Sequence, residues 1–306
     1  MNATIDAQHK TLQKQIQNND VDRQIDDQVI RVNDHTLVRE VTIKPTMCGH
    51  NALLIAQIGD WTWDSVSRLC HVNAFTAKDS EGNPTYLSFY YYQLLGTEAF
   101  HLHMPSFGDR LQIVSSCFGS GSESVLTLHR ISAVDRQLPP TLSTQEVLHE
   151  RLPACLYVQN FNRWIQRGAA GNTALYTASP EGFQYQLLPE VSQEHSPRLA
   201  YDLARRQGAF PLEETYEKTD QWIIHYDVDM ARDLNGVGVL YFASYFSIVD
   251  TTLAKVWLKV GRDARSFFSR VIKNQRVCFL GNTEAGTRLS IKVCRYVNNS
   301  ATKKIN

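Results

Sequence analysis

The spacing of apolar and polar residues predicts strands and helices in an order that occurs twice along the chain. In the first copy, an extended run at residues 37–44 precedes a helix on which Trp63, Val66 and Cys70 recur at helical spacing. Alternating segments rich in β-branched and aromatic residues then predict strands, two of them joined by a Gly/Ser turn as a β-hairpin. These strands are expected at 85–92, 109–118, 123–131 and 154–159.

The second copy begins with an extended run at residues 222–230. A helix follows, and Gly261 is expected to end it. Two further strands are expected at 275–280 and 287–297, the latter alternating apolar with polar residues. The apolar face of this second helix is expected to consist of Tyr245, Val249, Leu253 and Val256.

The two copies can be brought into register. Aligning Gly49 with Gly236 places Ala56 on Ala243 and starts both helices at about the same offset. A strand, a long helix and antiparallel strands wrapped around that helix are typical of the hot-dog fold, because the helix needs a sheet to bury its apolar stripe. The chain is therefore expected to be an α+β double hot-dog. The alternative is one α+β domain with an accidental echo.

Three segments follow from this organisation. Residues 1–34 contain sixteen Asp, Asn or Gln and no aromatic residue, so they are expected to form a polar tail, mobile or loosely helical. Residues 35–165 hold the first hot-dog repeat with the strand of the candidate site. Residues 166–306 hold a linker and the second repeat.

Composition favours a globular protein of the cytoplasm. The 306 residues are 43% hydrophobic and 20% charged, with no net charge. The longest nearly apolar stretch, 236–246, is far shorter than the ~20 residues of a bilayer-spanning helix, and the N-terminus has no apolar signal core, so no membrane association is expected. The six cysteines form no C-x-x-C pair and are expected to be reduced and mostly buried.

Charge is distributed unevenly. Residues 251–306 carry twelve Lys and Arg against Asp263 and Glu284, so this stretch is +10 and the remainder is −10. A phosphate-bearing coenzyme or an acidic carrier protein would be attracted to such a region, and salt would weaken the association; the alternative is a solvated basic face. No zinc-finger, RNP or helix-turn-helix signature is present, so no nucleic-acid partner is expected.

Standard catalytic motifs are absent. The chain has no G-x-S-x-G elbow, phosphate-binding loop, dinucleotide fingerprint or H-E-x-x-H helix. His101 and His103 resemble half of a metal site, but no third ligand lies at a suitable spacing, so no metal is expected. Asp60 and Asp64 are either an acid pair or carboxylates at the start of a helix.

The first predicted helix start is a candidate for binding a thioester. Gly59, Asp60, Trp61 and Thr62 are expected there, with Asp60 or Thr62 as the N-cap. Free N–H groups at a helix start can hold an oxygen on which negative charge develops.

A tyrosine-rich strand is expected beside this helix. Alternation would place Tyr86, Ser88, Tyr90 and Tyr92 on one face of the strand. Most strand tyrosines pack with a satisfied hydroxyl, so at least three of the four tyrosines Tyr86, Tyr90, Tyr91 and Tyr92 are expected to do only this.

Long strings of residues resemble one known family. The strings at 47–70, 84–96 and 107–130 are similar to the acyltransferase/decarboxylases of leinamycin biosynthesis, and 234–255 resembles the second half of these proteins. The likeness covers most of residues 37–297. It implies a double hot-dog enzyme that takes methylmalonyl-CoA as substrate, removes the carboxylate and transfers the propionyl group to the phosphopantetheine of an acyl carrier protein, for polyketide β-alkylation.

The resemblance also implies site residues. The functional tyrosine is matched by strand position to Tyr86, with Tyr90 and Tyr92 remaining open. Tyr86 can donate a hydrogen bond, act as a phenolate or carry the acyl group. No adjacent base is visible, which places the acyl-tyrosine role below the hydrogen-bonding and electrostatic roles but leaves it open. His50 and Asn51 are further candidates for touching substrate. No bound cofactor is expected, since the coenzyme A thioester is itself the substrate.

Two other functional classes are compatible with a hot-dog fold. One is a thioesterase or dehydratase acting on a coenzyme A or carrier-bound acyl chain, and the other is a carrier-binding module without catalysis. A dehydratase would show a histidine and a carboxylate across the two helix starts, whereas the second helix start offers Ser244 and Ser247.

Overall fold

The fold is built around a long helix, α2, and an antiparallel sheet. The computed structural model describes residues 27–48, 51–166, 176–192, 196–212, 215–236 and 238–298. The strands of the main sheet are β1 (Gln28–Asn33), β2 (Thr36–Thr42), β3 (Thr85–Leu95), β4 (Arg110–Gly119), β5 (Ser124–Ala133), β6 (Leu156–Gln166), β7 (Tyr176–Thr177) and β9 (Asn274–Cys278).

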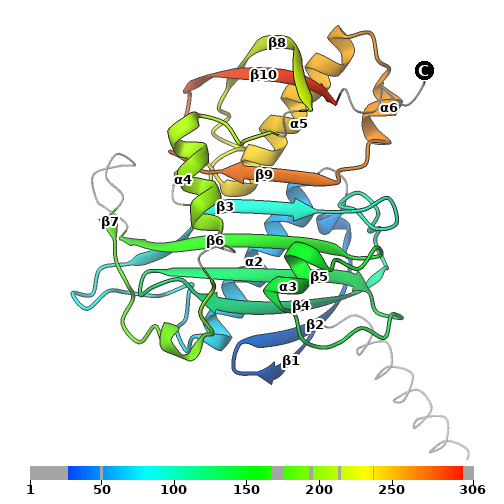
Figure 1. The fold of residues 1–306 in the computed structure, drawn as a ribbon. Coiled ribbons are helices and arrows are strands. Elements are labelled where there is room, and N and C mark those ends of the chain that lie inside the picture. Colours follow the sequence, from blue (N-terminus) through cyan, green and yellow to red (C-terminus); the bar gives the residue numbers. More distant parts are fainter. Residues whose placement is uncertain are drawn as a thin grey trace, which may run out of the picture.

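The sheet separates two layers of helices. Its strand order is β1-β2-β4-β5-β6-β3-β9, with β7 paired to β6, and every pairing is antiparallel. Figure 1 shows α2 behind the sheet, and α3 and α4 in front of it. The helices of these layers are α2 (Asn51–Leu69), α3 (Thr144–His149) and α4 (Pro197–Gln207), with short 3-10 turns at Pro45–Met47 and Tyr185–Leu187.

The second half of the chain is smaller. Its long helix α5 (Phe242–Lys259) packs against β8 (Tyr216–Asp227), which pairs with β10 (Arg288–Asn298) in a two-stranded sheet. A short helix, α6 (Ala264–Phe268), follows α5, and β9 then joins the main sheet beside β3. The α+β double hot-dog is confirmed, but the two halves are unequal in the described residues, because one strand of the second half completes the sheet of the first.

Several sequence-based boundaries were wrong. The first helix begins at Asn51 rather than near residue 60, because the apolar residues 52–56 continue the helical spacing of Leu54, Ile55 and Ile58 and do not form a strand. Residues 28–33, placed in the polar tail, form β1. Residues 1–26 of that tail lie outside the described residues.

The repeat register and the predicted face of the second helix also need correction. If Gly49 is aligned with Gly236, the start of α5 lies four residues later than the position that aligns with the start of α2. Leu253, expected in the core, is 36% exposed. The face of α5 that is buried consists of Ala243, Ser244, Phe246, Ile248, Thr252 and Val256.

A buried polar layer divides the core between α2 and the sheet. The Thr62 hydroxyl donates to the Ile58 carbonyl and accepts from Asn160 Nδ2 at 2.7 Å, and it lies 2.9 Å from His129 Nε2. Ser115 Oγ lies 2.8 Å from His129 Nδ1. These partners fit a neutral imidazole that donates from Nε2 and accepts at Nδ1. Burial, with a smaller effect of Arg39, lowers the pKa of His129 to about 3.

This buried histidine should make the stability depend on pH. Below about pH 6.5 the unfolded chain binds a proton at His129, whereas the folded chain does not until near pH 3, so folding stability falls as the pH is lowered between these values. Between pH 7 and pH 5 the loss from this group should be about 2 kcal/mol. Urea unfolding at both pH values should show a smaller loss in His129→Gln than in wild type. Equal losses would contradict the buried, neutral state.

Candidate functional site

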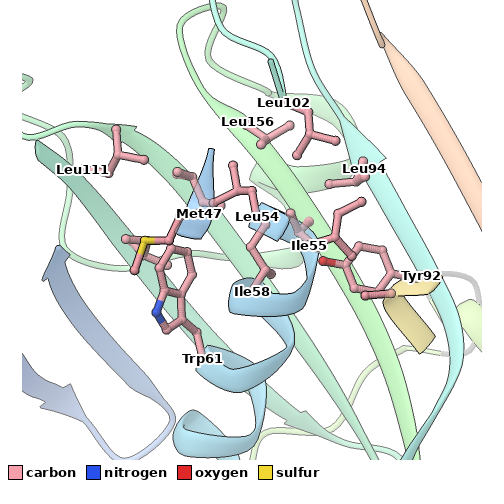
Figure 2. Close-up of a cluster of buried hydrophobic side chains, with 14 of the residues drawn as sticks. Met47, Leu54, Ile55, Ile58, Trp61, Tyr92, Leu94, Leu102, Leu111 and Leu156 are labelled. Atoms are coloured by element: carbon pink, nitrogen blue, oxygen red, sulfur yellow. The ribbon is translucent and has the colours of Figure 1, made fainter. Parts of the chain in front are cut away.

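The predicted helix-start site does not exist as such. Gly59, Asp60, Trp61 and Thr62 lie in the middle of α2, where each backbone N–H is bonded to the carbonyl four residues earlier. Their amides are therefore not available to an oxyanion. Trp61 is 2% exposed and packs beside Met47 in the core shown in Figure 2, and Thr62 is held in the polar layer. Only Gly59 and Asp60 turn toward α5.

Gly59 allows α2 and α5 to approach closely. A Cβ built on Gly59 would lie 2.8 Å from Cε1 of Phe242 and closer still to its Cζ. The Phe242 ring cannot easily move away, because it stacks on Phe89 with centroids 4.1 Å apart. The contact places the first turn of α5 against the side of α2.

Gly59→Ala should therefore open this helix contact. We expect the free energy of unfolding to fall by about 1–2 kcal/mol, since overpacking costs more than the gain in helix propensity. Gly236→Ala is the matched control, because no atom lies within 4 Å of the Cβ position there. Chemical denaturation of both variants measures the difference; an unchanged stability in Gly59→Ala would contradict the close packing.

Tyr86 lies at the rim of the sheet beside this contact. Strand β9 pairs with β3 only from Tyr91 to Leu95, so Tyr86 precedes the shared part of the strand. Its half-buried ring meets Trp63 of α2 edge-on, with centroids 5.0 Å apart. Tyr86 is thus placed next to α2, as the sequence predicted, although its chemical role stays a prediction.

The second half of the chain contributes a phenol to the same place. Tyr241 is the N-cap residue of α5 and is half-buried. Burial, the Asp60 carboxylate and the Tyr86 phenol all raise the pKa of Tyr241. Desolvation also raises the pKa of Asp60. The Asp60 carboxyl group of α2 and the Tyr86 phenol of β3 therefore both lie within electrostatic range of the Tyr241 phenol.

Tyr92 adds a buried hydroxyl on the inner side. The sequence predicted that Tyr92 shares a face with Tyr86, which is wrong, because a bulge between Phe89 and Tyr91 shifts the register against β6. Tyr92 is 0% exposed, and Figure 2 shows its hydroxyl beside Ile55 of α2. Within the described part of the chain the hydroxyl has no hydrogen-bond partner, and burial, then Tyr241, raises its pKa well above the ordinary value.

The remaining predicted site residues are less informative. His50 lies outside the described residues, and Asn51 is the first residue of α2, with a side chain that is not described. Ser88 is half-buried on β3 and faces Arg163 of β6 in register.

In the described ranges no group of three His, Cys, Asp or Glu could hold a metal ion. The rings of His101 and His103 meet edge-on with centroids 6.0 Å apart, and His103 Nδ1 lies 3.3 Å from the Arg270 carbonyl oxygen.

Part of the basic surplus of the last 56 residues is neutralised by carboxylates from earlier in the chain. Four of its cations form ion pairs with carboxylates outside or just before that stretch, namely Arg270 with Asp250, Lys273 with Glu98, Arg288 with Asp227 and Arg295 with Asp220. All six cysteines are free thiols, but only three of them, Cys70, Cys117 and Cys155, are buried, fewer than predicted. No helix in the described ranges has the length and apolar character needed to cross a bilayer.

Tyr241 was missed from the sequence. A tyrosine that precedes a helix has no chemical signature of its own. At this helix start the sequence pointed instead to Ser244 and Ser247. The position of Tyr241 near Asp60 and Tyr86 depends on how the two halves of the chain pack together. Local sequence patterns do not predict that packing.

Comparison with known proteins identifies the family of the chain. Residues 38–211 match the model of the LnmK N-terminal Hot Dog Fold domain, while no curated protein sequence matches. An acyl-ACP thioesterase from Bacteroides thetaiotaomicron is similar in structure, with a TM-score of 0.49, 9% identity, and coverage of 83% of this chain and 85% of that one. The 12:0-ACP thioesterase from Umbellularia californica has a TM-score of 0.46 and 10% identity, covering 88% and 100%. The matched segment spans more than half of the sequence and includes α2, β3 and Tyr86, so the chain belongs to the LnmK N-terminal hot-dog family.

Proposed function

We propose that the chain converts methylmalonyl-CoA to a propionyl group and transfers this group to an acyl carrier protein. The observation that carries the proposal is the convergence of Tyr86, Tyr241 and Asp60 between the two halves, with the unpartnered hydroxyl of Tyr92 on the inner side. Membership of the hot-dog family supports an acyl thioester as the substrate.

The proposed reaction begins with loss of the carboxylate. The bond between the α-carbon and the carboxylate breaks, CO2 leaves, and the electron pair enters the thioester as an enolate. Phenol donors aimed at the enolate oxygen stabilise this charge more strongly than they stabilise the neutral thioester. We assign this role to Tyr86 and Tyr241, because a phenol can donate a hydrogen bond and the raised pKa of Tyr241 favours its protonated, donating form.

The carboxylate itself is assigned to the inner end of the site. The groups around Tyr92 are mostly apolar, including Phe89, Phe242 and Ile55. A carboxylate held there by one phenol would be poorly solvated, which favours its loss as neutral CO2.

Asp60 is suited to supply the next proton. Its raised pKa leaves a larger fraction of the carboxyl group protonated than an ordinary aspartate would have, which improves a general acid. Protonation of the α-carbon gives the propionyl thioester. The carrier thiol then attacks the carbonyl carbon, and coenzyme A leaves as the thiol.

Intact-mass spectrometry of a phosphopantetheinylated carrier protein tests the proposal. Incubation with methylmalonyl-CoA and the full chain should add the mass of a propionyl group to the carrier. Addition of a methylmalonyl mass would contradict the decarboxylation step. Release of free coenzyme A without any adduct would favour a thioesterase, and no change in either species would favour a binding module.

A further inference from the structure

A second group of aromatic and basic residues lies on the face of the sheet opposite α2. Tyr90 and Tyr91 of β3 meet two aromatic residues of the following segments, with centroids 5.5 Å apart for Tyr90 and Tyr201 and 6.2 Å for Tyr91 and Phe210. Strand β9 supplies Arg276, which lies over the Phe210 ring at 4.7 Å. The group therefore spans the junction between the two halves, where β3 pairs with β9.

Three arginines surround these rings. Arg163 lies over Tyr90 at 5.3 Å and is paired with Glu123 at 3.2 Å. Burial raises the pKa of the Tyr201 phenol, and Arg205, near the end of α4, lies close enough to oppose this larger effect by lowering the pKa. Neither Arg205 nor Arg276 forms an ion pair with a carboxylate of the described residues, in contrast to Arg270, Lys273, Arg288 and Arg295. Stacked guanidinium groups keep their N–H donors in the ring plane free for an anion.

Strand β3 connects the region of these three arginines to the candidate site. In the first half of β3, the half-buried residues Tyr86, Ser88 and Tyr90 alternate with the buried residues Leu87 and Phe89. Four residues of strand correspond to about 13 Å between Tyr86 and Tyr90. A pantetheine chain has its thiol at one end and its phosphate at the other, and it is long and flexible enough to follow this strand.

We propose that Arg205 and Arg276, together with Arg163, bind the phosphate of a phosphopantetheine thioester whose acyl end reaches Tyr86. The inference rests on the proposed function and adds the place where the donor is anchored. The same phosphate occurs in coenzyme A and in the arm of a carrier protein. A planar guanidinium fork matches phosphate oxygens, and charge-assisted hydrogen bonds of this kind are strong.

Calorimetric binding of coenzyme A and of pantetheine, which lacks the phosphate, tests this anchor without any turnover. In Arg276→Gln the Kd for coenzyme A should rise about tenfold or more, while the weak binding of pantetheine should stay the same. Arg205→Gln changes an exposed helix position and should raise the Kd for coenzyme A several-fold. This second variant keeps the test valid if Arg276→Gln folds poorly. Arg262→Gln is the matched control, because Arg262 also stacks on a ring, Trp257, at 4.3 Å, but lies outside the group.

Two outcomes would overturn the anchor. One is unchanged coenzyme A binding in both variants, and the other is an equal loss of coenzyme A and pantetheine binding. Titration with phosphopantetheinylated and unmodified carrier protein distinguishes the two sources of the phosphate. If the arginine substitutions weaken binding of the modified carrier, the arginines bind the phosphate that both molecules share. If they weaken binding of coenzyme A alone, the arginines bind its nucleotide phosphates. Arginine-dependent coenzyme A binding without propionyl transfer would contradict the proposed function and leave the anchor intact.

Discussion

Tyr86→Phe should lower the rate of propionyl transfer about 10²- to 10³-fold, the range seen when one donor to a developing oxyanion is removed. The ring is retained, so its edge-on contact with Trp63 should be kept. Steady-state rates with methylmalonyl-CoA and a carrier protein give the comparison. We expect the change in kcat, with KM nearly constant, because the hydrogen bond strengthens mainly in the transition state.

Tyr185→Phe provides the control for this substitution. Tyr185 is also half-buried and packs against an aromatic ring, Phe183, with centroids 5.9 Å apart, but it lies in the 3-10 turn at Tyr185–Leu187 and not on β3. Its variant should react at the wild-type rate. A Tyr86→Phe protein that transfers propionyl groups as fast as wild type would remove Tyr86 from the reaction and favour a role in packing.

Tyr92→Phe should make the protein more stable and less active. An unpartnered buried hydroxyl costs about 1–3 kcal/mol, so its removal should raise the free energy of unfolding by about 1 kcal/mol. If the hydroxyl donates to the substrate carboxylate, turnover should fall about 10- to 100-fold, as expected for a hydrogen bond to a charged group. Urea unfolding and steady-state kinetics on the same preparation measure both effects.

Tyr157→Phe is the matched control for the stability effect. The Tyr157 hydroxyl donates to Glu146 Oε1 at 2.7 Å and accepts from the Leu152 N–H at 3.0 Å. The same substitution there should destabilise the protein by about 1–3 kcal/mol, because two partners lose a bond. A Tyr92→Phe variant that is destabilised to a similar extent would mean that the Tyr92 hydroxyl has a structural partner.

The strands were the part of the fold that sequence patterns predicted best. Strands β3, β4 and β5 were expected within three residues of their observed ends, because alternation and the Gly/Ser turn of the hairpin are local signals. The start of α2 was not predictable in the same way, since a short apolar run such as 52–56 fits a buried strand and a buried helix equally well. The amphipathic helix α4 was missed, because it buries only Pro197, Tyr201 and Ala204.

The candidate site was predicted only in its local parts. Tyr86 and Asp60 were singled out from their own segments, but the assignment of Asp60 to a helix start was wrong. Tyr241 reaches them through the packing of α5 on α2, which depends on Gly59 and Phe242. Tyr92 changed faces because of one bulge residue in β3, and a bulge has no dependable sequence signal when no glycine marks it.

A crystal structure with a non-reactive thioether analogue of methylmalonyl-CoA tests most directly whether the reaction site lies between the two halves. We expect the carbonyl oxygen of the analogue within hydrogen-bonding distance of Tyr86 or Tyr241, and its carboxylate beside Tyr92. An analogue bound with its acyl group away from the junction of α2, α5 and β3 would contradict this location.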